Sequence, residues 1–175
     1  MKKIGFIDYF LDEWHANNYP ALIDKFSEGE MKVCYAYAYT AAPEWAISNE
    51  AWAEKMGVAL LGSIEEVIEK SDYLIVLSPD NPEMHEELCE LPLKSGKRTY
   101  VDKTFAPDKE TAIRIFENAE KHGTPCFSSS ALRFSEELND IDLSRIDKIY
   151  SEGPGPLDIY SIHQIEPVVR LMNAR

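Results

Sequence analysis

The chain has 175 residues, and its 18 Lys and Arg residues against 31 Asp and Glu residues give a formal net charge of −13. Such an acidic chain is repelled by the phosphates of nucleic acids and by anionic membrane surfaces, so a protein that binds either one electrostatically is not expected. With 45% hydrophobic residues it is too apolar for a disordered acidic tail, and its length suits one domain, or one domain and part of another.

Short apolar runs alternate with helical patterns along most of the chain, which is typical of an α/β fold with a parallel sheet. The runs show little strict alternation of apolar and polar residues, which favours strands that are covered on both faces. Six strands are predicted, over residues 3–7, 31–39, 58–61, 73–77, 98–101 and 125–128.

Proline, asparagine and glycine residues indicate where the first two predicted helices begin and end. Pro20 favours the first turn of a helix, so the first helix is expected to begin near Asn18 or to kink there. His15 is then expected on an apolar face of this segment. The second helix is expected to be capped by Asn49 and to end at Gly57.

Three further helices are predicted before the last strand of the sheet. The helix over residues 64–70 opens with a capping box of Ser63 and Glu66. Another is expected over residues 81–94. The longest has apolar residues at helical spacing and ends before Gly123.

After Ser130 the pattern changes. Residues 141–149 alternate and are expected to approach a strand, and a helix is expected over residues 159–173. We therefore expect residues 1–127 to form one complete domain, and residues 128–175 to form the start of a truncated or minimal C-terminal domain.

The cysteines and the amino terminus indicate the cellular setting. Cys34, Cys89 and Cys126 are odd in number and far apart, so neither a disulfide framework nor a metal site is expected. The first apolar run, residues 4–7, is too short for a signal peptide or for a membrane span of roughly 20 residues. A reduced, soluble, cytoplasmic protein is predicted.

Ligands of open parallel sheets bind beyond the carboxyl ends of the strands, so the residues that follow each strand are the candidate site. Those residues are unusually polar here. They are Asp8, Tyr9, Tyr39, Thr40, Ser78, Pro79, Asp80, Asn81, Asp102, Lys103, Thr104, Ser128, Ser129 and Ser130.

Lys103 and His163 are the residues with the clearest chemistry. A lysine at a strand end can hold a substrate oxygen or transfer a proton, and the alternative is a solvated lysine paired with Asp102. His163 lies three residues before Glu166, so the carboxylate can orient its imidazole on a helix, although the two residues could equally form a surface pair. His85, early in its helix, could contact a ligand or lie in an ordinary first turn.

Four motifs follow one another along the chain: Pro79-x-x-Pro82-x-x-His85, Gly96-Lys97-x-x-x-Val101-Asp102-Lys103-Thr104, Arg133-Phe134 and His163-x-x-Glu166. In order and spacing they resemble the Gfo/Idh/MocA family (glucose-fructose oxidoreductase, inositol dehydrogenase, rhizopine catabolism). The resemblance spans nearly the whole chain and implies an α/β fold with a Rossmann-like doubly wound parallel sheet. A short partial second α+β region follows, of a type commonly used for dimerisation, which leaves a homo-oligomer open.

The resemblance also implies a function. It implies NAD or NADP as cofactor, a sugar or polyol as substrate, and hydride transfer with Lys103, His163 and Glu166 as catalytic residues facing one crevice. Lys103, Ser130, Arg133 and His163 would contact the substrate. The cofactor would be contacted by Asp8, Tyr9, Phe10, Thr40, Ser78, Pro79, Asn81, His85, Asp102 and Lys103.

The segment after the first strand departs from a dinucleotide-binding pattern. No glycine occurs between Gly5 and Gly29, where backbone and pyrophosphate would have to approach closely. Asp8, Asp12 and Glu13 would also repel phosphate. The second strand ends without the acidic residue that binds the adenosine ribose.

Two hypotheses from different classes therefore stand. The first is an NAD(P)-dependent oxidoreductase that acts on a carbohydrate-type CH–OH group. The second is a catalytically silent binding or interaction protein that keeps the fold but has lost the dinucleotide. A third, weaker hypothesis is that an uncharged ligand binds beyond the strand ends, where Ser128, Ser129 and Ser130 offer hydroxyl groups.

Overall fold

The computed structural model describes residues 1–172, and Asn173, the expected end of the last helix, lies outside them. The chain divides into two compact units, Met1–Phe127 and Ser128–Arg175. Within the described residues, none of the helices combines the length and the apolar character that crossing a membrane requires.

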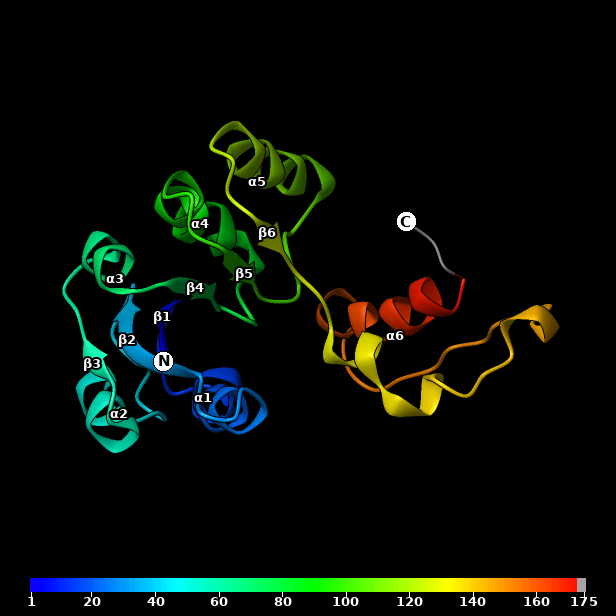
Figure 1. Cartoon of the computed structure of the whole chain (residues 1–175), viewed down its shortest axis with the longest axis horizontal. Coiled ribbons are helices and arrows are strands. Elements are labelled where there is room, and N and C mark those ends of the chain that lie inside the picture. The colour runs from blue at the N-terminus through cyan, green and yellow to red at the C-terminus, as the bar shows by residue number, and fades with distance from the viewer. Residues whose placement is uncertain (173–175) are drawn as a thin grey trace. The chain divides into compact units, whose positions relative to one another are not determined.

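The first unit is built on a six-stranded parallel sheet with the order β3-β2-β1-β4-β5-β6 (Figure 1). The chain passes from β1 outward to β3 and then returns to the other side of β1, so the strand order reverses between β1 and β4. This topology confirms the predicted Rossmann-like doubly wound fold. The strands are β1 (Lys2–Asp8), β2 (Met31–Ala38), β3 (Ala59–Leu60), β4 (Tyr73–Val76), β5 (Thr99–Val101) and β6 (Cys126–Phe127).

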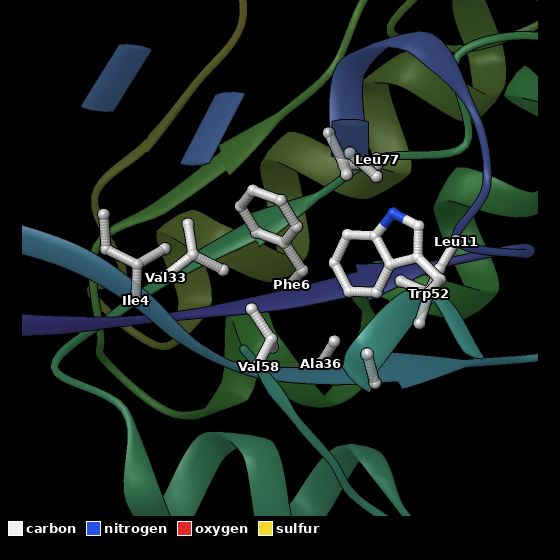
Figure 2. Packing of buried hydrophobic residues seen from close by; sticks show 10 residues of the cluster. Ile4, Phe6, Leu11, Val33, Ala36, Trp52, Val58 and Leu77 are labelled. Atoms are coloured by element: carbon white, nitrogen blue, oxygen red, sulfur yellow. The ribbon is translucent and has the colours of Figure 1, made fainter. Parts of the chain in front are cut away.

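Helices cover both faces of this sheet, which explains why its strands are apolar on both sides. On one face, α1 (Trp14–Phe26) and α2 (Asn49–Met56) pack on a core that contains Phe6 and Trp52 (Figure 2). A second core, on the other face, contains Ile7 and residues of three helices. These are α3 (Ile64–Lys70), α4 (His85–Lys94), which follows the short 3-10 helix η1 (Pro82–Met84), and α5 (Lys109–Lys121).

Gly5 allows α3 to pack closely on β1. A Cβ atom at this position would lie 2.3 Å from Cγ1 of Val67 and 2.4 Å from the hydroxyl oxygen of Ser71. Both residues are buried, with exposed fractions of 0% and 4%, so neither side chain can easily give way. The middle of β1 therefore requires glycine because of packing, not because of backbone conformation.

Two helices begin at other residues than expected. α1 begins at Trp14, with Pro20 in its interior, because the side chain of Glu13 caps its first turn. α2 is capped by Ser48, whose hydroxyl accepts from the N–H of Ala51 at 3.2 Å. The predictions of a start near Asn18 and of Asn49 as the cap were therefore wrong.

Asn49 has a different role, as a buried link between two loops. Its Oδ1 accepts from the N–H of Leu11 at 3.0 Å, and its Nδ2 donates to the carbonyl of Thr40 at 2.8 Å. The side chain thus ties the loop after β1 to the loop after β2, and it is only 8% exposed.

The second unit contains helices and irregular segments. Three short 3-10 helices, η2 (Ala131–Phe134), η3 (Glu136–Leu138) and η4 (Leu143–Arg145), precede α6 (Leu157–Leu171). Residues 128–172 contain no strand, so the prediction of a strand over residues 141–149 was wrong. Ile141 and Leu143, whose alternation suggested it, are 38% and 49% exposed.

The packing at Gly5 can be tested directly. Gly5→Ala should lower the free energy of unfolding by about 1–3 kcal/mol, because the added methyl group overpacks the contact between β1 and α3. Urea denaturation measures this change. Gly62→Ala is the control, since its Cβ atom would meet only a flexible carboxylate oxygen, at 3.7 Å. Equal unfolding midpoints for the two variants would contradict the packing argument.

Candidate functional site

The carboxyl ends of β1, β2, β4 and β5 form one edge of the sheet, which we call the crest. Ligands of doubly wound folds bind outside this edge, where the strand order reverses. Asp8 ends β1, Ser78 follows β4 closely, and Asp102 follows β5. Each of the three is at most 1% exposed. The crest therefore carries two buried carboxyl groups at the position where a ligand is expected.

Asp8 joins β1 to the loop after β4. Its Oδ1 accepts from the N–H of Tyr9 at 2.7 Å and from the N–H of Ser78 at 2.9 Å. Ser78 has a left-handed backbone conformation, with a φ of 72°, which costs a non-glycine residue roughly 1–2 kcal/mol. Oδ2 of Asp8 has no hydrogen-bond partner within residues 1–172. Burial, followed by the nearby carboxylate of Glu13, raises the pKa of Asp8 well above its ordinary value of 3.8.

Glu13 caps α1 with its own side chain. Oε2 accepts from the N–H of His15 at 2.7 Å, and Oε1 accepts from the N–H of Ala16. Oε2 also lies 3.0 Å from Nδ1 of His15. A helix amino terminus carries unpaired N–H groups and partial positive charge, and it therefore favours an anion. In this protein that anion is the carboxylate of Glu13.

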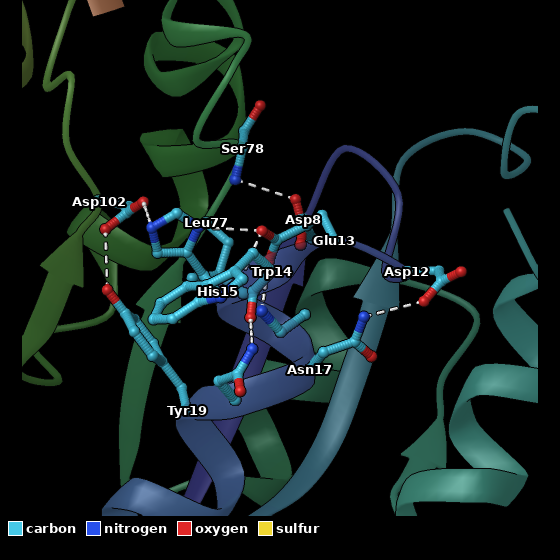
Figure 3. A network of polar contacts seen from close by, with 12 residues as sticks. Asp8, Asp12, Glu13, Trp14, His15, Asn17, Tyr19, Leu77, Ser78 and Asp102 are labelled. Carbon is cyan, nitrogen blue, oxygen red and sulfur yellow. Dashed lines mark hydrogen bonds and ion pairs between the residues drawn. The ribbon is translucent and has the colours of Figure 1, made fainter. Parts of the chain in front are cut away.

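His15 connects this cap to the end of β5 (Figure 3). Its Nε2 lies 3.6 Å from Oδ2 of Asp102. Oδ1 of Asp102 accepts from the hydroxyls of Tyr100 at 3.0 Å and of Tyr19 at 3.4 Å. Burial, followed by the charge of Asp102, raises the pKa of both tyrosines, so they remain hydrogen-bond donors. A polar network thus runs from the start of α1 to the end of β5.

Lys103 lies beside this network and is not part of it. It is only 8% exposed, and its ammonium forms no ion pair within residues 1–172. The neighbouring Asp102 is already engaged by two tyrosines and His15. Lys103 is therefore a largely buried lysine without an ion pair in the part of the chain that the structure describes, and not a solvated lysine paired with Asp102.

Aromatic rings surround the ends of β1 and β2. Tyr9 stacks on Tyr39, with ring centroids 6.0 Å apart, and Phe10 meets Trp45 edge-on at 5.6 Å. The N–H of Thr40 donates to the carbonyl of Tyr9 at 2.9 Å, which holds the two loops together. The predicted contacts Tyr9, Phe10 and Thr40 thus lie on neighbouring loops of the crest.

His85 follows the loop of residues 78–81, which holds the other predicted cofactor contacts. Its ring is fully buried, with Nδ1 3.0 Å from the carbonyl oxygen of Phe105 and Nε2 2.5 Å from that of Leu77. Burial lowers its pKa and favours the neutral ring. The imidazole therefore lies between the loops after β4 and β5, where the neutral ring can donate to one of the two carbonyl oxygens, and its contact with a cofactor stays a prediction.

In the second unit, α6 carries His163 and Glu166. Oγ of Ser130 lies 2.6 Å from Nδ1 of His163. The carboxylate of Glu166, which is 8% exposed, accepts from the N–H of Ser130 at 3.3 Å and pairs with Arg133 at 2.7 Å. Ser130 therefore contacts both the imidazole and the carboxylate. The structure brings together all four residues that were predicted for this part of the chain.

Sequence reasoning missed the network around His15. The helical pattern places this residue on an apolar face, and its ring does meet Tyr19 edge-on at 5.2 Å. Its nitrogens, however, face the carboxylates of Glu13 and Asp102. The signal that could have revealed the cap is the acidic pair Asp12-Glu13 immediately before the helix, although Pro20 favours a later start.

The sequence matches a family of known proteins. The model of the oxidoreductase family with an NAD-binding Rossmann fold, Gfo/Idh/MocA, matches residues 28–130. The chain belongs to this family. The resemblance of the motifs is thereby confirmed. The match begins after α1, so the loop after β1 and the capped helix precede it.

Several solved structures resemble this chain. A dehydrogenase (MviM) from Clostridium difficile has 20% identity and a TM-score of 0.73, with 98% of this chain and 57% of that one covered. D-galactose-1-dehydrogenase from Rhizobium etli has 15% identity and a TM-score of 0.57, with 78% and 40% covered. The WlbA dehydrogenase from Chromobacterium violaceum, solved with NADH and UDP-GlcNAcA, has 16% identity and a TM-score of 0.58, with 73% and 34% covered.

These likenesses establish the fold, and the chain spans between about a third and just over half of the length of each of these structures. A search of curated proteins finds no match.

A dinucleotide would have to bind at the capped helix. Its pyrophosphate requires glycines at positions i, i+2 and i+5 around the turn from the first strand to the first helix. At that spacing this Gfo/Idh/MocA chain has Asp8, Phe10 and Glu13. The N–H groups of α1 that suit a phosphate are present, and Glu13 occupies them. The donors at α1 therefore fit an anion, but a pyrophosphate fits there only after this carboxylate has moved.

The raised pKa of Asp8 gives a pH-dependent test. Because the folded state holds the proton more tightly than the unfolded state, wild-type stability should fall as the pH rises from 3.8 toward the raised pKa. Asp8→Asn cannot ionise, so its stability relative to wild type should increase over this range, by about 1.4 kcal/mol for each unit of pKa shift. Urea unfolding at a series of pH values measures the difference.

Asp12→Asn is the matched control for this experiment. Hydrogen bonds from Asn17, at 2.9 Å, and from the N–H of Ile47, at 3.0 Å, hold the pKa of Asp12 below its ordinary value. The stability that they provide is present above pH 3.8 and is lost as the pH falls, so the effect should have the opposite sign. Parallel pH curves for wild type and Asp8→Asn would refute the assignment.

Proposed function

We propose that this chain is a dehydrogenase that acts on the hydroxyl-bearing carbon of a sugar or polyol, with NAD or NADP as cofactor. The family description supports the cofactor class, and the name of D-galactose-1-dehydrogenase supports a carbohydrate substrate. When bound, the nicotinamide supplies the hydride exchange. The residues of the chain bind the reacting oxygen and move its proton.

The observation that carries this proposal is the position of Lys103 at the crest, where the residue is only 8% exposed and forms no ion pair within residues 1–172. Lysines are seldom buried unless they are paired, so a largely buried lysine without an ion pair is a candidate for function. Lys103 lies at the crest, where ligands of this fold bind. We assign to it the hydrogen bond to the reacting oxygen, because a fixed positive charge there stabilises the negative charge that develops during the reaction.

We assign the proton transfer to His163. An imidazole exchanges protons near neutral pH, and a general base works best when its ring is held in one orientation. Ser130 contacts Nδ1 of the ring, and Glu166 accepts from the backbone of Ser130. In this scheme Glu166 and Ser130 position the imidazole, and Arg133 neutralises Glu166. The contacts of Ser130 and Arg133 with substrate stay predictions.

Removing the ammonium of Lys103 tests its role. Lys103→Ala should lower kcat/KM for sugar oxidation by about 100-fold or more, because it removes an interaction with the charge of the transition state. Lys109→Ala, at an exposed position that opens α5, should leave the rate unchanged. NADH formation, followed by absorbance over a panel of sugars and polyols, gives both values. An unaffected Lys103→Ala rate would exclude the assignment.

The histidine is tested through the pH profile. His163→Asn should lower kcat by about 100-fold or more and abolish the acid limb of the profile, because the proton acceptor is lost. His122→Asn, at an exposed position at the end of α5, is the control and should retain both the rate and the limb. If His163→Asn keeps the limb, the base is another residue.

Cofactor binding separates this proposal from a catalytically silent binding protein. Titration with NADH and with NADPH, followed by calorimetry, should show saturable binding to wild type, even if it is weak. The proposed function fails if neither wild type nor any crest variant binds either cofactor.

A further inference from the structure

The N–H groups at the start of α1 form an anion site that the chain fills with its own carboxylate. We propose that Glu13 decides whether a phosphate group can bind at the crest, because it competes with the cofactor's pyrophosphate for these N–H groups. This inference rests on the proposed function, and it identifies the residue that limits cofactor binding.

The competition follows from the donors that Glu13 uses. Its two carboxylate oxygens accept from the backbone N–H groups of His15 and Ala16, and one oxygen also contacts the His15 ring. Its side chain is 9% exposed, so the carboxylate is held inside the site and not at its rim. A phosphate oxygen would need the same N–H groups in the same place. The two anions therefore cannot bind together.

The surroundings make displacement of Glu13 necessary. A phosphate that entered with Glu13 in place would meet this carboxylate as well as the buried carboxyl group of Asp8, whose Oδ2 has no hydrogen-bond partner within residues 1–172. The negative charge of Glu13 would repel the phosphate strongly in this largely buried site, because solvent screens buried charges little, and Asp8 offers the phosphate no compensating positive charge.

Displacement of Glu13 would also affect the far end of the network. It breaks the 3.0 Å contact with Nδ1 of His15, whose Nε2 lies 3.6 Å from Asp102. Asp102 directly precedes Lys103, the proposed contact of the reacting oxygen. Binding of a phosphate at α1 is therefore coupled through His15 to the residues beside Lys103.

Affinity for anions, measured by calorimetry with inorganic pyrophosphate and with NADH, tests this inference. Glu13→Gly removes the competing carboxylate and leaves glycine at position i+5, so it should lower the Kd of both ligands by about tenfold or more. Glu13→Gln keeps the length of the side chain and an acceptor oxygen but removes the charge, and should lower both Kd values by a smaller factor.

Asp108→Gly is the matched control. Asp108 caps α5 in the same way, by accepting from the N–H of Thr111 at 2.8 Å, so this variant loses a carboxylate cap of similar kind. Its Kd values should equal those of wild type, which separates release of the α1 site from the general effect of losing a cap.

The results distinguish this inference from the proposed function. Equal NADH affinity in wild type and Glu13→Gly would overturn the role of Glu13 and leave the dehydrogenase proposal intact. Binding of inorganic pyrophosphate by Glu13→Gly, with no binding of NADH or NADPH by any variant, would support the competition and reject the dehydrogenase. Failure of both glutamate variants to bind pyrophosphate more tightly than wild type would also overturn the inference.

Discussion

The hydrogen bonds from the first turn of α1 to Glu13 determine how the crest of this protein is built. They start the helix at Trp14. The first residue fixes which of the later residues of α1 face the sheet and which face outward. Ala16 is thereby buried in the core, and Asn17 accepts a hydrogen bond from the indole of Trp52 at 3.0 Å. Tyr19, one turn further along the helix, reaches the end of β5.

The sheet could be predicted from the sequence because its strands are covered on both faces. Such strands appear as apolar runs, and their order along the chain, with helices between them, is enough to suggest a doubly wound sheet. The alternating segment of residues 141–149 did not form a strand for a related reason. Alternation shows which side of a strand would be apolar, but a strand also needs a neighbouring edge, and residues 128–172 contain none.

The positions of the site residues were predictable, but their partners were not. Asp8, Ser78 and Asp102 follow from the strand ends alone. Their contacts join residues far apart in sequence, such as Asp8 with Ser78 at a separation of 70 residues and Tyr19 with Asp102 at 83. No local pattern encodes such pairs. The start of α1 was misjudged because Pro20 is a visible signal, whereas a glutamate becomes a cap only when its backbone is extended, as in Glu13 with φ −129° and ψ 170°.

Family membership and the unusual crest can be reconciled by considering where charge resides. The raised pKa of Asp8 keeps its buried carboxyl group protonated to a higher pH than an ordinary aspartate, which limits its contribution to the negative charge of the crest. Asp102 accepts hydrogen bonds from two tyrosine hydroxyls, and its Oδ2 lies 3.6 Å from Nε2 of His15. Glu13 alone occupies the donors that a phosphate would use. The family match covers β2 to β6 and Lys103, and it begins after this residue. The donors at the start of α1 that suit a phosphate are therefore occupied by a residue outside the matched region.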